Sequence, residues 1–327
     1  MQAVSKKPCI REGRVNKMEL SILLFFQMLS MMLMILMGYA IVKLGVVRSE
    51  QSSLLSAITL YIIVPCMVID AFQIDYSPEK LNGLLLAAGV AFIMHVIFIL
   101  VSKLLGKTLQ ISEVEKNSLI YSNGGNLIVP LVSALLGSEQ IFYCCAFMTV
   151  QLFFLWTHAV SSIGGSKERS IKKKLTNPNI LAVGVGLLIF FTNTRLPGIL
   201  GTTVKSVGGV VGPVCMIMLG MIMADANLKE AFLSKRNWLI CFGRLILYPF
   251  LMILLLFATR VTHVIPYAKD VLMILFLAIG APVATTITQM ANIFNKDAKH
   301  AGAINVMSVI LSIITLPLML ALYQRIL

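Results

Sequence analysis

Ten apolar stretches of 18 to 24 residues follow one another along the chain, and they constrain its fold more than any other feature. A helix of about 20 mostly apolar residues can cross the hydrocarbon core of a bilayer. With 58% hydrophobic and 13% charged residues, the chain also lacks the polar surface of a soluble protein, in which roughly 25% of residues are charged. The predicted spans are 20–42, 51–69, 81–102, 117–138, 140–163, 177–194, 206–224, 237–259, 271–293 and 301–324. The sequence therefore predicts an all-α polytopic membrane protein with ten transmembrane helices.

The distribution of lysine and arginine between the loops predicts the orientation. The loops after the odd-numbered spans contain fifteen of these residues, whereas the opposite loops and the C-terminus contain six. By the positive-inside rule, the richer side is cytoplasmic and both termini are extracytoplasmic. We therefore expect a multi-pass protein of the cell membrane. The net charge of +13 does not indicate a nucleic-acid partner, because basic residues are expected in membrane-protein loops and no soluble domain carries a basic face.

The N-terminal tail, residues 1–17, departs from this pattern because it adds five basic residues to the outer side. A signal peptide does not explain the tail, since the apolar run after it is too long and has no small-residue cleavage site. We interpret Met18 as the true start and residues 1–17 as an extension of the gene model. Tryptic peptides from upstream of Met18 in the purified protein would contradict this interpretation.

A basic loop at residues 167–176 divides the ten spans into two sets of five, residues 18–166 and 177–327. An odd number of spans in each half makes the second half enter the membrane from the opposite side. If the halves are homologous, they form an inverted-topology repeat. The second and seventh spans support this relation, because each has a proline followed by a small patch of apolar and sulfur-containing residues, at Pro65 and at Pro213.

The fourth and ninth spans contain the residues least compatible with a continuous helix. Glycine costs about 1 kcal/mol and proline about 3 kcal/mol in a helix interior. Unwound backbone at membrane depth occurs only where it is buried or lines a cavity. The sequence therefore predicts that helices 4 and 9 are broken and cross each other. The residues concerned are Asn123, Gly124, Gly125, Asn126, Pro130, Pro282, Thr285, Thr286 and Gln289.

Broken helices at matching positions of two halves indicate a transporter binding site. The N-terminus of each half-helix presents free N–H groups and a partial positive charge, so two such ends favour an anion. The neutral side chains of these spans would add hydrogen bonds. The alternative interpretation is that the prolines only kink the helices and the amides join neighbouring helices.

Several stretches resemble the auxin efflux carrier family, which includes plant auxin carriers and bacterial organic-anion permeases. The similar segments are Tyr121-Ser122-Asn123 through Pro130-Leu131, Asn177-Pro178-Asn179 with Gly186-Leu187, Pro197-Gly198, Pro213 through Leu219-Gly220, Ala281-Pro282, and Thr315-Leu316-Pro317-Leu318. The resemblance implies a five-plus-five inverted repeat, a scaffold bundle, and a transport bundle that moves like an elevator.

The resemblance also implies two substrate contacts. Asn123 matches an asparagine that contacts the substrate carboxylate, and Gln151 in the fifth span matches a family glutamine. The chain departs from the family pattern at Gly125 and Asn126, and it lacks the long cytosolic loop of many plant members. The expected substrate is therefore not auxin.

Three ionisable residues in or beside the spans are candidates for ion coupling, namely Asp70, His95 and Arg244. An ionisable side chain within a membrane segment is by default a functional candidate. For Arg244 we favour snorkelling to the cytoplasmic interface, with Asp225 as its partner. For His95 we favour packing, and for Asp70 a solvated loop charge. The sequence predicts no cofactor and no metal site, and it leaves open whether a proton or sodium is coupled.

The sequence thus predicts a secondary transporter for a small organic anion, either a mono- or a dicarboxylate, and not an enzyme. No nucleotide-binding or metalloprotease motif is present in the sequence. Two alternatives remain open: a sodium- or proton-coupled symporter of the bile-acid or sodium–proton type, and a non-transporting membrane receptor with a vestigial site. The expected partners are the organic anion and the lipid bilayer, and a homodimer is left open.

Overall fold

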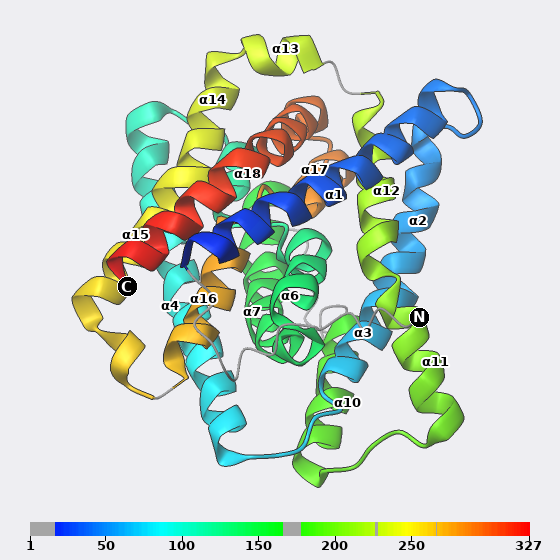
Figure 1. The fold of residues 1–327 in the computed structure, drawn as a ribbon. Coiled ribbons are helices and arrows are strands. Elements are labelled where there is room, and N and C mark those ends of the chain that lie inside the picture. Colours follow the sequence, from blue (N-terminus) through cyan, green and yellow to red (C-terminus); the bar gives the residue numbers. More distant parts are fainter. Residues whose placement is uncertain (1–16, 166–177, 226–227, 266) are drawn as a thin grey trace.

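The computed structural model describes residues 17–165, 178–225, 228–265 and 267–327. These residues form helices joined by short turns (Figure 1), and the only extended pairing among them is an isolated β-bridge. Of the predicted tail, only Lys17 is described. The basic loop 167–176 lies wholly outside the described residues.

The helices follow the chain in one series. Their bounds are α1 (Lys17–Lys43), α2 (Ser52–Ile58), α3 (Val64–Ala71), α4 (Pro78–Leu109), α5 (Glu113–Ile120), α6 (Val129–Leu136), α7 (Ile141–Phe154), α8 (Val160–Gly164), α10 (Pro178–Thr192), α11 (Gly198–Gly209), α12 (Val211–Met223), α13 (Leu228–Leu233), α14 (Lys235–Phe242), α15 (Tyr248–Thr259), α16 (Ala268–Gly280), α17 (Thr285–Ile293) and α18 (Ala298–Ile326). One-turn π-helical segments join α2 to α3, α7 to α8, and α14 to α15.

Each of the ten predicted spans coincides with helical structure. In the part of the chain that the structure describes, seven helical rods are long and apolar enough to cross a membrane. They are Phe25–Lys43, Ser49–Ala71, Pro78–Leu109, Ile141–Gly164, Gly198–Met223, Lys235–Thr259 and Ala298–Ile326. The sixth predicted span is the shorter helix α10, and the fourth and ninth are interrupted. Large apolar side chains such as Phe26, Leu188 and Phe257 are exposed on the rods, as expected for surfaces that face lipid.

Polar residues cap the helices at the ends of these rods. Ser77 accepts a hydrogen bond from the Lys80 N–H at the start of α4, and Pro78 occupies the first turn, where an N–H would have no partner. Ser112 and Glu115 form a reciprocal capping box at the start of α5. These caps satisfy donors that the helix itself leaves unpaired.

Two glycines allow α1 and α12 to lie in backbone contact. A Cβ atom at Gly38 would lie 2.0 Å from the Ile217 carbonyl oxygen, and one at Gly220 would lie 1.9 Å from that of Ile35. No larger residue fits at either position. This contact joins the first rod to the one that contains α11 and α12 (Figure 1).

Most helix contacts fall into two groups, and α1 bridges them because it contacts both α12 and α18. In one, α1 and α2 contact α12, while α3 contacts α10 and α11. In the other, α4 contacts α7, and α14 to α17 contact α18. Figure 1 shows α6 and α7 near the centre, between α4 on one side and α3 and α12 on the other. The interrupted spans therefore lie inside the molecule.

Candidate functional site

Both spans predicted to be broken are interrupted in the structure. Helix α5 ends at Ile120, and helical structure resumes at Gly124 and continues into α6. Helix α16 ends at Gly280, and α17 begins at Thr285. We call residues 121–123 and 281–284 the paired breaks, because the two segments contact each other.

Main-chain hydrogen bonds join the paired breaks. Ser122 and Val283 form an antiparallel β-bridge. The Asn123 N–H donates to the Pro282 carbonyl at 2.8 Å, and the Ala284 N–H donates to the Tyr121 carbonyl at 3.0 Å. The two unwound segments therefore satisfy part of each other's backbone at a depth where water is scarce.

Gln151, on α7, holds the first break. Its Nε2 donates to the Ser122 carbonyl at 2.9 Å, and its Oε1 accepts from the Ser122 N–H at 3.2 Å and from the Ser122 hydroxyl at 2.9 Å. Both ends of the amide are thus engaged with one residue. The geometry makes Gln151 a positioning residue for the backbone of the break.

Asn305 and Ser308, on α18, hold the second break in the same way. Asn305 Nδ2 donates to the Val283 carbonyl at 2.7 Å, and the Ser308 hydroxyl accepts from the Val283 N–H at 3.1 Å. These two residues are not among the predicted site residues. A signal was present, because Asn305, Ser308 and Ser312 put polar groups at helical spacing on one face of an apolar span.

Arg244 is fully buried, with 0% of its surface exposed. Its guanidinium contacts the helix ends that adjoin the paired breaks. Its Nη1 donates to the carbonyls of Leu119 at 3.1 Å and Ile120 at 3.4 Å, at the end of α5. Its Nε donates to the Ala281 carbonyl at 3.0 Å, and its Nη2 donates to that of Ile279, at the end of α16.

The expectation that Arg244 snorkels towards Asp225 is therefore wrong. The last carbonyls of α5 and α16 have no donor within their own helices, and a guanidinium supplies five donors in a fixed fork. This demand for donors inside the molecule holds the side chain there. Asp225 is instead exposed and lines a cavity of about 490 Å³ beside α13 and α18.

Asn123 presents an unused donor at the first break. Its side chain is 4% exposed, and its Nδ2 has no hydrogen-bond partner among the described residues. The first N–H groups of the helical stretch that begins at Gly124 also lack intrahelical acceptors. Because buried polar groups are nearly always paired, this cluster of free donors indicates a place for an acceptor.

The structure brings together only some of the predicted site residues. Asn123, Gly124, Gly125, Pro282 and Thr285 lie at the paired breaks or at the first turn that follows them. Thr286 is half-buried and Gln289 is exposed, further along α17. The side chain of Asn126 is outside what the structure describes.

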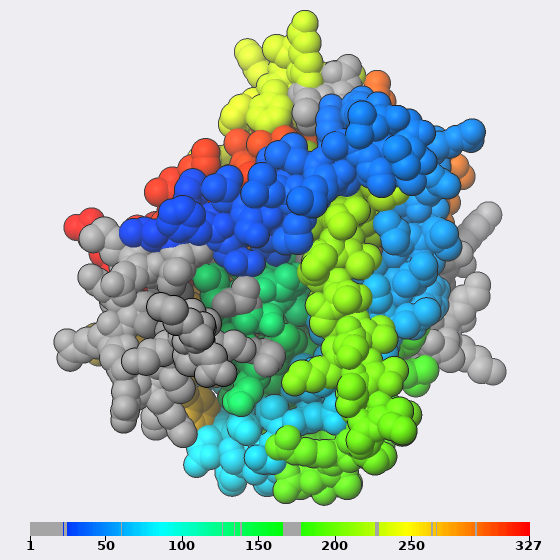
Figure 2. Space-filling model, turned by 45° about the vertical axis from the view of Figure 1, so that its right-hand side comes forward, coloured from blue at the N-terminus to red at the C-terminus, as the bar shows by residue number. Residues whose placement is uncertain are grey.

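A cavity of about 850 Å³ lies between the two groups of helices. Pro130 and Ser133 of α6, Gly212 and Pro213, and Asp70 of α3 line it. Figure 2 views the face on which α1 and the α11–α12 rod border the recessed α6 and α7. Pro130 and Asp70 are therefore in the cavity wall. Asn123 is not among the described lining residues, and it precedes α6 in the sequence.

Charges of both signs line this cavity. Asp75 and Arg195 form an ion pair of 2.6 Å near its mouth, and Lys80 Nζ donates to the Asp75 carbonyl. Asp70 is half-buried on α3 and Lys205 lies on α11, and both line the cavity. No ion pair within 4.0 Å joins these two among the described residues.

His95 is packed rather than placed in the cavity wall. It is 1% exposed, its Nδ1 lies 2.7 Å from the Ala91 carbonyl, and its ring stacks on Phe154 with centroids 5.3 Å apart. This agrees with the favoured interpretation of a packing residue. Its other ring nitrogen has no hydrogen-bond partner among the described residues.

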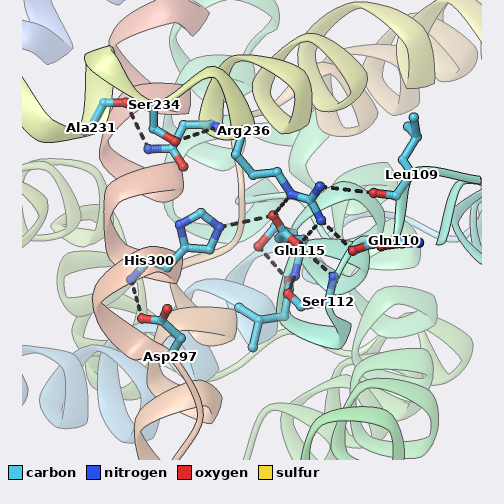
Figure 3. Close-up of polar contacts among 12 residues, drawn as sticks. Leu109, Gln110, Ser112, Glu115, Ala231, Ser234, Arg236, Asp297 and His300 are labelled. Atoms are coloured by element: carbon cyan, nitrogen blue, oxygen red, sulfur yellow. Dashed lines mark hydrogen bonds and ion pairs between the residues drawn. The ribbon is translucent and has the colours of Figure 1, made fainter.

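A second polar cluster fixes the start of α5. The side chain of Glu115 accepts hydrogen bonds from Arg236 Nε at 2.6 Å and from the Ser112 N–H at 2.6 Å, and His300 Nε2 lies 3.2 Å away (Figure 3). Arg236 also donates to the carbonyls of Leu109 and Gln110. Burial opposes ionisation of Glu115, but the bonds from His300, Arg236 and Ser112 outweigh it and hold the pKa of this carboxyl well below its usual range.

The described residues contain no group of three or more His, Cys, Asp or Glu side chains that could hold a metal ion. The five cysteines within them, Cys66, Cys144, Cys145, Cys215 and Cys241, are free thiols. The sixth, Cys9, lies outside the described residues.

Comparisons with known proteins agree with this architecture. A family model described as membrane transport protein matches residues 23–170 and 165–320. An uncharacterized transporter of Methanothermobacter thermautotrophicus is 24% identical over 302 residues, which cover 89% of this chain and 95% of that protein. An uncharacterized transporter of Methanocaldococcus jannaschii is 22% identical over 213 residues, which cover 62% of this chain and 69% of that protein. The chain is therefore a multi-pass membrane protein that belongs to the membrane transport protein family, the family of auxin efflux carrier-type transporters.

Proposed function

We propose that the protein is a secondary transporter that carries a small organic anion across the cell membrane by alternating access. The observation that carries this proposal is the buried, unpartnered Nδ2 of Asn123 beside the N-terminus of a helix, at the junction of two broken spans. A carboxylate placed there would accept from this amide and from the first N–H groups of the helix.

The two clamps on the paired breaks support an inverted repeat of five plus five spans. Gln151 lies in the fifth predicted span and Asn305 in the tenth, and each holds the break of the preceding span. Such an arrangement is expected when one five-helix unit occurs twice in opposite orientations.

An elevator-like movement accounts for the position of the cavity. Helices α1 to α3 and α10 to α12 would form the fixed scaffold, and α4 to α7 with α14 to α18 would form the moving bundle with the paired breaks. Helix α1 would lie at their boundary, because it contacts both α12 and α18. The cavity of about 850 Å³ lies between them and is lined by both. Movement of the bundle along the scaffold would expose the anion first to one side and then to the other.

The orientation follows the positive-inside rule. The side with α13 and the Glu115 cluster would be cytoplasmic, and the side with the α10–α11 turn would be extracytoplasmic (Figure 1). The cavity is lined by Asp75 and Arg195 from the latter side, so this conformation would receive anion from outside the cell.

Uptake into proteoliposomes tests the proposal. We expect flux of at least one radiolabelled acid from a panel of acetate, lactate, pyruvate, malonate, succinate and malate, with and without proton and sodium gradients. Binding without flux would instead indicate a receptor, and flux that requires sodium or a pH gradient would assign the coupling ion.

Asn123→Ala tests the site itself. We expect it to reduce uptake about tenfold or more, because it removes a buried donor to a charged acceptor. Asn82→Ala, on the exposed face of α4, is the matched control and should transport at the wild-type rate. Full activity of Asn123→Ala would overturn the site assignment.

A further inference from the structure

The electrostatic balance of the paired breaks depends on one side chain. Each helix end carries a partial charge of about one half, positive at the N-terminus and negative at the C-terminus. Two C-terminal ends, of α5 and α16, and two N-terminal ends, of the stretch 124–136 and of α17, meet here. These four partial charges sum to zero, so the broken helices alone add no net charge to the site.

Arg244 changes this balance. Its guanidinium donates to carbonyls at both C-terminal ends, so it offsets their negative partial charge. None of the ion pairs among the described residues includes Arg244. Because an arginine stays protonated in proteins, the paired breaks carry one net positive charge that no carboxylate neutralises.

The neighbouring cavity adds no net charge. Among the described residues, its ionisable side chains are three acids, Asp70, Asp75 and Glu139, and three bases, Lys80, Arg195 and Lys205. A cargo that binds at the paired breaks therefore encounters one surplus positive charge. The second carboxylate of a dianion would find no unpaired cation there.

We propose that Arg244 sets the charge of the cargo, so that the site takes organic acids in their monoanionic form and rejects dianions. The proposal rests on the proposed function, because it concerns the same binding site. It does not require Arg244 to touch the cargo. The positive charge acts through the two C-terminal helix ends that it neutralises, which leaves the field of the N-terminal ends unopposed.

Competition on the wild-type protein tests this inference without any folding risk. Uptake of whichever radiolabelled acid of the panel is transported would be measured against matched competitors, namely succinate and its monomethyl ester, and malonate and its monomethyl ester. These pairs have nearly the same length but differ by one charge. At pH 7.5 we expect each monoester to inhibit at a concentration about tenfold or more below that of its diacid.

The pH dependence gives an independent reading. Inhibition by succinate should strengthen as the pH falls towards its second pKa, in proportion to the monoanion that forms, whereas inhibition by monomethyl succinate should stay constant. Equal or stronger inhibition by the dianion at pH 7.5 would overturn the inference while leaving the transporter function intact. Failure of every acid in the panel to be transported would instead overturn the proposed function.

Two substitutions assign the effect to Arg244. Arg244→Lys keeps the charge and should keep the preference for monoesters, with slower uptake because it loses hydrogen bonds to the helix ends. Arg244→Gln removes the charge and should bind each monoester and its diacid about equally well. Binding of the four compounds is measured as ligand-induced thermal stabilisation. A Gln variant that folds and still prefers the monoesters as strongly as the wild type would contradict the assignment.

Discussion

At the scale of single residues, the site is made of side chains that bind backbone rather than one another. Arg244, Gln151 and Asn305 all direct their donors at main-chain carbonyls of the paired breaks. A broken helix inside a membrane exposes N–H and C=O groups that cannot be left without partners. Fixed side chains that satisfy these groups allow the break to persist, while Asn123 Nδ2 has no partner among the described residues.

The clamp at Gln151 can be tested by its effect on stability. Gln151→Leu leaves the N–H and carbonyl of Ser122 without partners, so we expect a loss of about 2 kcal/mol in the free energy of unfolding. The measurement is thermal unfolding of the detergent-solubilised protein. Gln289→Leu, at an exposed position of α17, is the control and should unfold within a degree or two of the wild type. A Gln151 variant as stable as this control would show that the clamp is dispensable.

At the scale of helices, contacts between elements rather than helix propensity fix the arrangement. Helix α5 has eight residues, which is too few to be stable alone. It is held at its start by the Glu115 cluster, which joins it to α14 and α18, and at its end by Arg244. A short half-helix therefore keeps a defined position from which the first break begins.

The Glu115 cluster should make stability depend on pH. Because the pKa of Glu115 is lowered by folding, its contribution is present above the unfolded pKa of about 4.3 and is lost as the pH falls below that value. At pH 7 we expect Glu115→Gln to be less stable than the wild type by about 2 kcal/mol, and the difference should shrink between pH 5 and pH 3. Thermal unfolding across this range, with the exposed Glu50→Gln as control, provides the check. A constant difference at all pH values would count against an ionised Glu115.

The contact between α1 and α12 makes a second prediction. In Gly220→Ala the new Cβ meets the Ile35 carbonyl, so the two helices must separate and we expect a loss of about 3 kcal/mol or failure to fold. Gly184→Ala, in the interior of α10 with no atom within 4 Å of its Cβ position, is the matched control. It should leave stability unchanged or raise it by about 0.5 to 1 kcal/mol. Comparison of expression and unfolding temperature distinguishes the two outcomes.

At the scale of the whole molecule, the position of the cavity between two groups of helices links the fold to transport. One group is closed by the glycine contact of α1 with α12, and the other contains both breaks and their clamps. Under the proposed mechanism, the second group would move as a unit along the first. The direction of that movement depends on how the protein sits in the membrane.

Cysteine labelling tests the proposed orientation. In a cysteine-free background, Thr194→Cys in the α10–α11 turn should react with a membrane-impermeant maleimide in intact cells, whereas Lys229→Cys in α13 should react only after permeabilisation. Both side chains are exposed, so access across the membrane alone decides the result. The reverse pattern would invert the orientation.

Much of the fold was predictable from the sequence because the signals are local. Apolar runs predicted the helical segments, seven of which are, among the described residues, long and apolar enough to cross a membrane. Gly124-Gly125 and Pro282 predicted the breaks, since these residues disfavour a helix whatever surrounds them. The polarity of Asn123 and its position at the break were likewise visible. The partners of these residues were not.

Only the tertiary structure decided which side chains serve the breaks. Arg244 was expected at the interface, and Asn305 was not considered, because the carbonyls they bind belong to segments 35 or more residues away for Arg244 and 22 residues away for Asn305. Unpaired carbonyls arise only where helices end, and which donor reaches them depends on how distant helices pack. The sequence by itself determined the apolar segments and the positions where they break, whereas packing decided which side chains bind the backbone of the paired breaks.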